Sequence, residues 1–340
     1  MNNPTVSSLL TLLLALGLNP APALAGTKHA VQAKAALLCI PGLTQHSSTY
    51  EHLAEQMASH GITTTSLDVQ GFQAPEPGSK QEPIDFDQTV EQVRLAAKVY
   101  KRNHPNLPVF VLGESTGGTI ALKLAAKYPD CVDGILCSAP TWKVNGRNKI
   151  AFLEFLDLTL LRARRKGLAV NYVIRRTTVN KDIQAHMLQE EGRRQRFSIC
   201  ESLKFMRFIN ASPNTALQIK TTPVFIVQGL NDQLGKTKWS AMLFSKVSAN
   251  KKTLVLDASA EHLICEEGQC SKDIVEVMKN WMMKNSTSEV VAQTEGILLS
   301  SEALSEKEMH ATKELFKLAG VVPDATLVQH NSPELSEMTP

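Results

Sequence analysis

The segment that decides the fold is Val109-Phe110-Val111-Leu112-Gly113-Glu114-Ser115-Thr116-Gly117-Gly118. Its four leading apolar residues predict a buried strand, and helical spacing follows over residues 118–128. A strained turn between strand and helix lifts a serine hydroxyl clear of the backbone only if the residues two before and two after it are small. Gly113 and Gly117 meet that condition, so the pattern predicts that Ser115 is a nucleophile. A glycine-rich structural turn is the alternative interpretation.

Strand and helix patterns alternate on both sides of this segment. Short apolar or β-branched runs predict strands, and segments with helical spacing lie between them. Such alternation is typical of an α/β fold, with a parallel sheet covered by helices on both faces. Ligands of these sheets bind beyond the carboxyl ends of the strands, so partners of Ser115 are expected in the loops that follow strands. The predicted strands are 35–40, 62–67, 109–112, 132–137, 223–227 and 253–256, and the predicted helices are 50–60, 87–103, 118–128, 236–247 and 272–283.

A serine nucleophile needs a base, and the base needs a carboxylate to orient it. His262 follows the last predicted strand, in a loop that can reach back over Ser115. Asp232 follows the preceding strand and is the expected acid. The competing carboxylate is Asp257, which lies near the end of the last strand and close to His262 in sequence. The order serine, acid, histidine is the one that accompanies this kind of turn.

Two backbone N–H groups are needed to hold the oxyanion that forms when the serine attacks a carbonyl. One is expected from Thr116, the residue after the nucleophile. The other is expected from Leu43, in the loop after the first predicted strand, where Gly42 allows close backbone approach. The histidines are scattered and the chain has no Cys-x-x-Cys pair, so a metal site is not expected. The serine mechanism requires no cofactor, and none is expected.

Several segments together resemble one known family. They are Pro41-Gly42 with His46-Ser47-Ser48-Thr49-Tyr50, Leu67-Asp68-Val69-Gln70-Gly71-Phe72, the turn from Gly113 to Gly118, and the positions of Asp232 and His262. From residue 35 to residue 285 the chain resembles the monoacylglycerol lipase and lysophospholipase-like branch of the α/β-hydrolases, among the serine aminopeptidase-type hydrolases. The resemblance implies the α/β-hydrolase fold, a mostly parallel central sheet with helices on both faces and a helical cap. It also implies a serine hydrolase that cleaves carboxylic esters of lipids, such as monoacylglycerols or lysophospholipids, through an acyl-enzyme.

The chain departs from that branch at two loops. The oxyanion loop of that branch usually contains His-Gly, where this chain has Pro41-Gly42. The branch typically has a basic, Gly-flanked segment after the next strand, where this chain has Gln70-Gly71-Phe72. The fold alone does not determine the reaction, since one fold supports many functions. A serine peptidase, an acyltransferase and a catalytically silent binding protein therefore remain alternatives.

Composition marks a basic insertion between two parts of the core, which are expected at residues 35–140 and 221–285. Residues 141–220 form the expected cap and carry 16 Lys and Arg against 6 Asp and Glu, a charge of +10 (16 − 6). Such a cap can contact anionic lipids or a membrane surface, or it can simply be a solvated face. Nucleic acid is not an expected partner, because no recognition motif accompanies the charge. The basic clusters are Arg162, Arg164, Arg165 and Lys166, and Arg193, Arg194 and Arg196.

The amino-terminal residues 1–25 are expected to be a secretory signal peptide. Leu9 to Leu18 is an apolar run too short to span a bilayer, and Ala23-Leu24-Ala25 is a small-x-small cleavage pattern. Cleavage after Ala25 predicts a secreted, periplasmic or lumenal protein. A short uncleaved anchor or a disordered leader is the alternative.

The carboxyl-terminal residues 286–340 are expected to form an acidic, largely disordered tail. One helix is expected within it, capped by Ser305 and Glu308 and ended by Gly320.

Six cysteines in an exported chain permit disulfides. Cys39 and Cys137 lie within apolar strand patterns and are expected to be buried free thiols. Cys265 and Cys270 lie close together in a polar loop and are the best candidates for a disulfide.

Overall fold

The computed structural model describes residues 33–75, 78–142, 168–190, 192–194, 197–286 and 292–321. The expected signal peptide, the first basic cluster and Arg196 lie outside these residues. Within the described ranges no helix is both long and apolar enough to cross a membrane.

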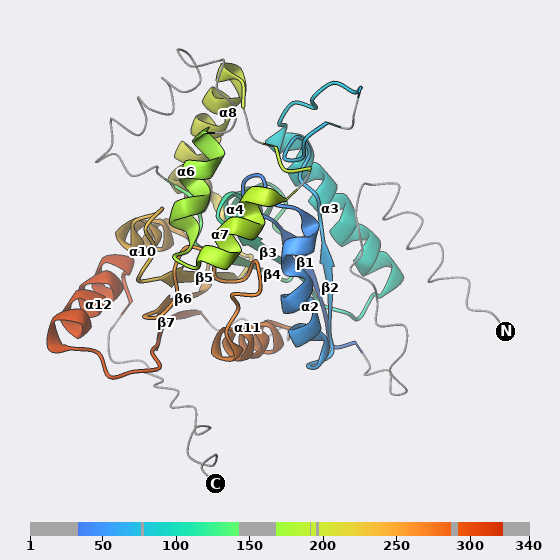
Figure 1. The fold of residues 1–340 in the computed structure, drawn as a ribbon. Helices are drawn as coiled ribbons and strands as arrows, with labels where there is room; N and C mark the ends of the chain where they lie inside the picture. The colour runs from blue at the N-terminus through green and yellow to red at the C-terminus, as the bar shows by residue number, and fades with distance from the viewer. Residues whose placement is uncertain are drawn as a thin grey trace, which may run out of the picture.

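Seven strands form one central sheet in the order β2-β1-β3-β4-β5-β6-β7, and every neighbouring pair is parallel (Figure 1). The inner strands are largely apolar and are buried along their whole length, which is typical of parallel sheets between helical layers. The strands are β1 (Ala35–Ile40), β2 (Ile62–Ser66), β3 (Val109–Glu114), β4 (Gly134–Ser138), β5 (Val224–Gly229), β6 (Lys251–Asp257) and β7 (Gln293–Leu299).

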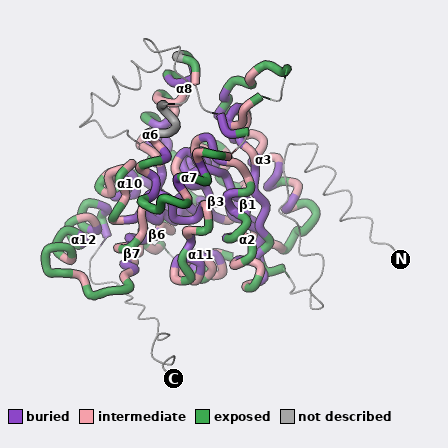
Figure 2. Tube along the Cα trace, in the orientation of Figure 1, coloured by how far each residue is buried: buried purple, intermediate pink, exposed green. Residues whose placement is uncertain are grey.

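Helices cover both faces of this sheet, and Figure 2 shows the buried strands between helices whose outer sides are exposed. One layer consists of α2 (Glu51–Ala58) and α11 (Lys272–Asn285), and the other of α3 (Phe86–Asn103), α4 (Thr116–Lys127), α10 (Thr237–Lys246) and α12 (Glu306–Ala319). Trp281 of α11 lies against Phe110 and Phe225 of the sheet, with ring centroids 5.9 and 5.5 Å away. Burying each such ring contributes roughly 1.5–3 kcal/mol. The sequence therefore predicted the two layers and the parallel sheet correctly.

Part of the expected cap is described and lies over the carboxyl ends of the strands (Figure 1). It consists of α6 (Leu168–Thr177), α7 (Lys181–Gln189) and α8 (Ile199–Asn210). The next helix, α9 (Ser212–Gln218), packs against α4 and α10 instead and so belongs to the core layer. The described cap therefore ends before residue 212 rather than at residue 220.

The second basic cluster is not the solvent-facing patch that the sequence suggested. Arg193 and Arg194 are each 5% exposed. Arg193 donates to the carbonyl of Thr44 at 3.2 Å. Arg194 pairs with Glu201 at 2.6 Å and donates to the carbonyl of Gly71 at 2.8 Å. Both guanidiniums fasten the cap to loops of the core, so the expectation of an exposed cluster is wrong for these two residues.

The prediction of a largely disordered tail over residues 286–340 is wrong for residues 292–321. β7 pairs with β6 along its whole length, and α12 packs against α10. The expected caps of the helix are confirmed, because Ser305 and Glu308 form a capping box and Gly320 ends α12 in the left-handed conformation.

The cysteines are free thiols in this structure. Cys39 and Cys137 are buried, as expected. Cys265 and Cys270 are also buried and lie in side-chain contact, but they do not form the disulfide that the sequence favoured.

Candidate active site

The strand order determines where a site can form. β1 lies between β2 and β3, so the order of successive strands reverses at this point of the sheet. At such a switch point the loops that leave neighbouring strands diverge and leave a crevice at the carboxyl ends. The loop after β1 holds Leu43, and the turn after β3 holds Ser115.

Ser115 occupies a strained turn between β3 and α4, with φ 53° and ψ −111°. Residues other than glycine rarely adopt a positive φ. A Cβ atom on Gly113 would lie 2.2 Å from the carbonyl of Gly117, and one on Gly117 would lie 2.1 Å from the carbonyl oxygen of Ile40. Both distances are far below van der Waals contact, so only glycine fits at the two positions that the sequence pattern singled out.

The structure brings Ser115, His262 and Asp232 into one hydrogen-bonded chain. His262 Nε2 lies 3.0 Å from Ser115 Oγ, and His262 Nδ1 lies 2.8 Å from Asp232 Oδ2. The side chains of His262 and Asp232 are 4% and 1% exposed. Water is therefore largely excluded from the bond between them, which strengthens it.

The surroundings favour charge on both partners of this bond. Burial lowers the pKa of His262, but the charge and hydrogen bond of Asp232 outweigh burial and leave that pKa raised. Burial raises the pKa of Asp232, but the charge of His262 and hydrogen bonds from His262, Gly235 and Gln228 leave it lowered. Asp232 is thus held in its ionised form, which is the form that can stabilise an imidazolium at His262.

The competing carboxylate Asp257 points elsewhere. Its Oδ1 accepts the N–H groups of Ser259 and Ala260 and the hydroxyl of Ser259, at 2.7–3.0 Å. It therefore shapes the turn before His262, whereas Asp232 contacts the imidazole itself.

The two expected oxyanion donors come from neighbouring loops. Thr116 begins α4, where the unpaired N–H groups of a helix point outward, and its side chain is buried. Leu43 follows Gly42, whose own N–H donates to the carboxyl group of Glu266 at 2.6 Å. Gly117 packs against the carbonyls of Ile40 and Pro41, so the loop after β1 lies against the serine turn. That contact brings the loop that carries Leu43 next to the turn that carries Thr116.

Comparisons with known proteins identify the family of the chain. The family model described as "Serine aminopeptidase, S33" matches residues 31–269 of the chain. The chain belongs to this family. Within the α/β-hydrolases it falls in the monoacylglycerol lipase-like branch.

Two curated relatives carry lipase names. The chain is 26% identical over 240 residues to the monoglyceride lipase of Homo sapiens, covering 69% of this chain and 77% of that protein. It is 23% identical to the monoacylglycerol lipase of Mycolicibacterium smegmatis, covering 72% and 86%.

A solved structure shows the same fold. A soluble variant of monoglyceride lipase from Saccharomyces cerevisiae, in complex with a substrate analog, superposes with a TM-score of 0.64 at 19% identity. The superposition covers 80% of this chain and 92% of that one. The fold class that the sequence predicted is confirmed, and the sheet is parallel throughout.

Sequence reasoning missed a further side chain that touches the serine in this S33-family chain. The Thr141 hydroxyl lies 2.9 Å from Ser115 Oγ, and the Thr141 N–H donates to the Ser115 carbonyl at 3.2 Å. Thr141 lies shortly after the end of β4, and this position beyond a strand is the feature of the sequence that could have pointed to it.

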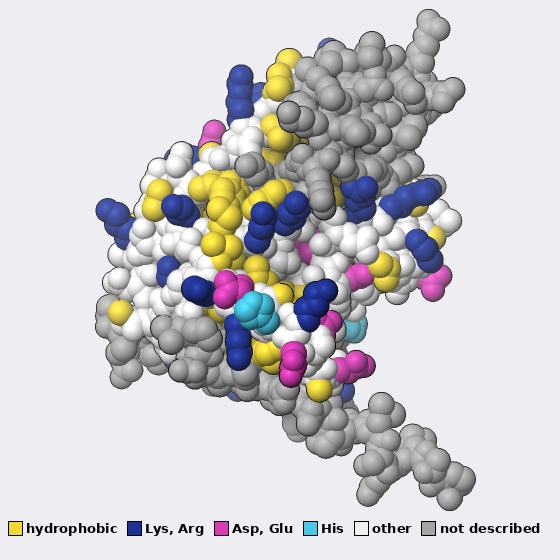
Figure 3. Space-filling model, turned by 90° about the vertical axis from the view of Figure 1, so that its left-hand side faces the viewer, with side chains coloured by type: hydrophobic (Ala, Val, Ile, Leu, Met, Phe, Trp, Pro, Cys, Tyr) yellow, Lys and Arg dark blue, Asp and Glu magenta, His cyan; other side chains and the backbone are white. Residues whose placement is uncertain are grey.

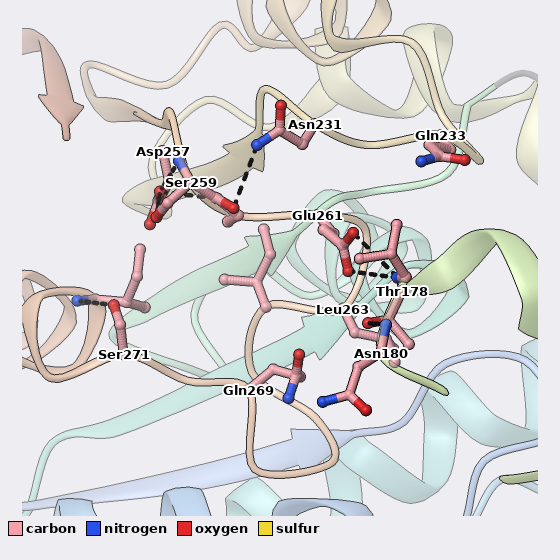
Figure 4. Close-up of a pocket in the computed structure, with 14 residues that line it drawn as sticks. Thr178, Asn180, Asn231, Gln233, Asp257, Ser259, Glu261, Leu263, Gln269 and Ser271 are labelled. Atoms are coloured by element: carbon pink, nitrogen blue, oxygen red, sulfur yellow. Dashed lines mark hydrogen bonds between the residues drawn. The ribbon is translucent and has the colours of Figure 1, made fainter. Parts of the chain in front are cut away.

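The cap is hydrogen-bonded directly to the loop that carries the histidine. Leu263 N–H donates to the carbonyl of Thr177 at 3.1 Å, and the Glu261 carboxylate accepts the N–H of Val179 at 2.9 and 3.1 Å. Figure 4 shows the Glu261 carboxylate directed at the turn between α6 and α7. The two residues that flank His262 are therefore tied to the cap.

A cavity of about 580 Å³ opens beside this loop (Figure 4). Polar side chains such as those of Asn180, Asn231 and Gln269 line it, together with Glu261 and Leu263. Ser115 and His262 are not among the lining residues. Within the described part of the chain no cluster of three or more potential metal ligands occurs.

Proposed function

We propose that this chain hydrolyses carboxylic esters of lipids, such as monoacylglycerols or lysophospholipids, with Ser115 as nucleophile. The observation that carries the proposal is the hydrogen-bonded chain from Asp232 through His262 to the Ser115 hydroxyl, at 2.8 and 3.0 Å. A base in contact with a hydroxyl, held by a buried carboxylate, is the arrangement that activates a serine.

The reaction proceeds in two halves. His262 takes the Ser115 proton while Oγ attacks the ester carbonyl, and the N–H groups of Leu43 and Thr116 hold the oxyanion. The imidazolium then gives its proton to the leaving alcohol, and the acyl group stays on Ser115. Water attacks this acyl-enzyme with His262 again as base, and the imidazolium returns the proton to Ser115 Oγ as the fatty acid leaves. Asp232 remains ionised throughout.

The names of the relatives support a lipid ester as the substrate. A monoglyceride lipase and a monoacylglycerol lipase match 69% and 72% of the chain. The cap lies over the carboxyl ends of the strands (Figure 1) and is tied to the histidine loop through Glu261. An acyl chain held beneath the cap would lie next to Ser115.

The proposal is tested by hydrolysis of p-nitrophenyl esters from acetate to palmitate and of a monoacylglycerol. The full chain is expected to turn over esters with a preference for longer acyl groups. Ser115→Ala is expected to retain its thermal unfolding transition and to lose turnover, because it lacks the hydroxyl that attacks the ester in the proposed mechanism. Ester hydrolysis that persists in Ser115→Ala would contradict the assignment.

One observation favours a second candidate. The matching family model is described as a serine aminopeptidase, and the same triad can attack an amide. Aminoacyl p-nitroanilides distinguish the two reactions, since a peptidase cleaves them and a lipid esterase does not. Acyl transfer would show as ester formation with an added alcohol in place of free acid.

We also propose that the protein is exported after cleavage following Ala25 and then contacts anionic lipid surfaces. The apolar run and the small-x-small pattern of residues 1–25 support export. Figure 3 shows hydrophobic side chains gathered in a band with Lys and Arg beside it, and Val179 of the cap is 60% exposed. Amino-terminal sequencing of protein from the producing cells and their medium tests export. A chain that begins at Gly26 is expected, and a retained residue 1 would contradict it.

A further inference from the structure

Glu114 precedes the proposed nucleophile in sequence, and its side chain is fully buried. Its carboxyl group accepts hydrogen bonds from three consecutive backbone N–H groups, those of Ile264 (2.5 Å), Cys265 (2.8 Å) and Glu266 (3.0 Å). Buried backbone N–H groups need such partners. The segment directly after His262 is thus fastened to the last residue of β3.

Glu266, in the same segment, reaches the opposite side of the site. It is 1% exposed, and its Oε1 accepts the N–H of Gly42 at 2.6 Å. The Tyr50 hydroxyl also contacts this carboxyl group and donates to the carbonyl of Ile40 at 3.0 Å. Gly42 immediately precedes Leu43, the expected oxyanion donor. One buried cluster therefore joins the histidine loop to the oxyanion loop.

The cluster holds two carboxyl groups where water does not reach them. Burial raises the pKa of Glu114 to about 7, against the lowering effect of the N–H groups of Ile264 and Cys265 and of His262. Burial and the nearby Glu114 raise the pKa of Glu266 well above its ordinary value. The other titratable groups around the pair are His262, Tyr50, Cys39, Cys265, Cys270 and Glu267. Only the imidazole among them can carry positive charge.

We propose that Glu114 and Glu266 are positioning residues for the proposed ester hydrolysis. Glu114 holds the His262 loop against the serine turn, and Glu266 holds the oxyanion loop through Gly42. The inference rests on the proposed function, because it assigns these residues to the site of Ser115.

The proposal has an electrostatic consequence. Ionised Glu114 adds to the effect of Asp232 and raises the pKa of His262. Replacing Glu114 by glutamine keeps an oxygen that accepts hydrogen bonds but removes the charge. The imidazole of that variant should therefore lose its proton at lower pH than in the wild type.

The first test is the pH profile of kcat/KM for the p-nitrophenyl ester that the full chain hydrolyses best. Glu114→Gln is expected to move the acidic limb to lower pH. It is also expected to lower kcat by about 10- to 100-fold, because small displacements of catalytic groups are costly. Glu266→Ala is expected to lower kcat similarly, and Glu266→Gln to recover most of that loss by accepting the Gly42 N–H. The control is Glu276→Gln, which removes a carboxylate of α11 that pairs with Lys279 away from the site.

The second test needs no turnover. A carboxyl group whose pKa is raised in the folded state keeps a proton that the unfolded chain has already lost above pH 4.5. Its contribution to stability is present below that pH and is lost as the pH rises. The Tm of Glu266→Gln relative to wild type is therefore expected to increase between pH 5 and pH 8, whereas Glu276→Gln should show no such trend.

The outcomes separate the two proposals. Suppose that turnover depends on Ser115 but that Glu114→Gln has the wild-type kcat and the wild-type acidic limb in its pH profile of kcat/KM. The positioning role is then wrong and the proposed function stands. If the Tm difference between Glu266→Gln and wild type does not change from pH 5 to pH 8, the role assigned to the buried Glu114–Glu266 pair is likewise wrong. If the wild type shows no turnover that depends on Ser115, the proposed function fails and the positioning role fails with it.

Discussion

At the scale of single residues, the site depends on how Asp232 is held. Its Oδ1 accepts the N–H groups of Leu234 and Gly235, and its Oδ2 accepts Gln228 Nε2 and faces His262. These bonds fix the carboxylate in the orientation that selects one tautomer of the imidazole.

Asp232→Asn tests this role. The amide keeps the shape of the side chain but presents the wrong hydrogen-bonding pattern to His262, so kcat is expected to fall by about 10⁴-fold. Loss of the negative charge is also expected to lower the His262 pKa and to move the acidic limb of kcat/KM to lower pH. Asp257→Asn is the matched control, since the side-chain hydrogen bonds described for Asp257 are all to Ser259 and Ala260. Equal effects of the two substitutions would show that the acid has been misassigned.

The sequence indicated the residues whose chemistry is tied to strand ends. Ser115, His262 and Asp232 each follow a strand, and parallel strands bring such positions to one edge. Glu114 lies in the same short segment as Ser115, but nothing in the sequence identifies the three N–H groups from which it accepts hydrogen bonds. Those donors depend on the path of the loop after His262, which no local pattern encodes.

At the scale of elements, β7 is the strand that the sequence did not reveal. Its first half is polar and contains Gly296, where a Cβ atom would lie 2.8 Å from Phe316 and 2.6 Å from Val321. An edge strand needs fewer apolar residues than a central one, so the hydrophobic pattern of residues 293–299 indicates a strand only weakly. The glycine is explained by the close approach of α12, which only the tertiary structure shows.

Truncation tests the contribution of β7 and α12. A chain that ends after Asn285 would lose the burial of Leu298, Leu299 and Phe316, and about 5 kcal/mol of unfolding free energy is expected to go with it. A chain that ends after Val321 is the control and is expected to unfold at the wild-type urea concentration. If the two truncations unfold alike, β7 and α12 do not contribute to the core.

At the scale of the whole molecule, the strand order unites residues that are far apart in sequence. The loops after β1, β3, β5 and β6 all leave the same edge of the sheet, and they bring Leu43, Ser115, Asp232 and His262 together. The cap joins this edge through Arg193, Arg194 and Glu261. Alternation of strands and helices was enough to predict the sheet, whereas the burial of the two arginines depends on how the cap lies on the core.

The central claim is that Ser115 is an activated nucleophile, and covalent labelling tests it most directly. The full chain and Ser115→Ala would be treated with a fluorophosphonate, and the adduct would be located by mass spectrometry of peptides. The account predicts rapid labelling of one site, Ser115, and no labelling of the variant. A folded wild-type protein that stays unlabelled, or that is labelled at another residue, would contradict the account.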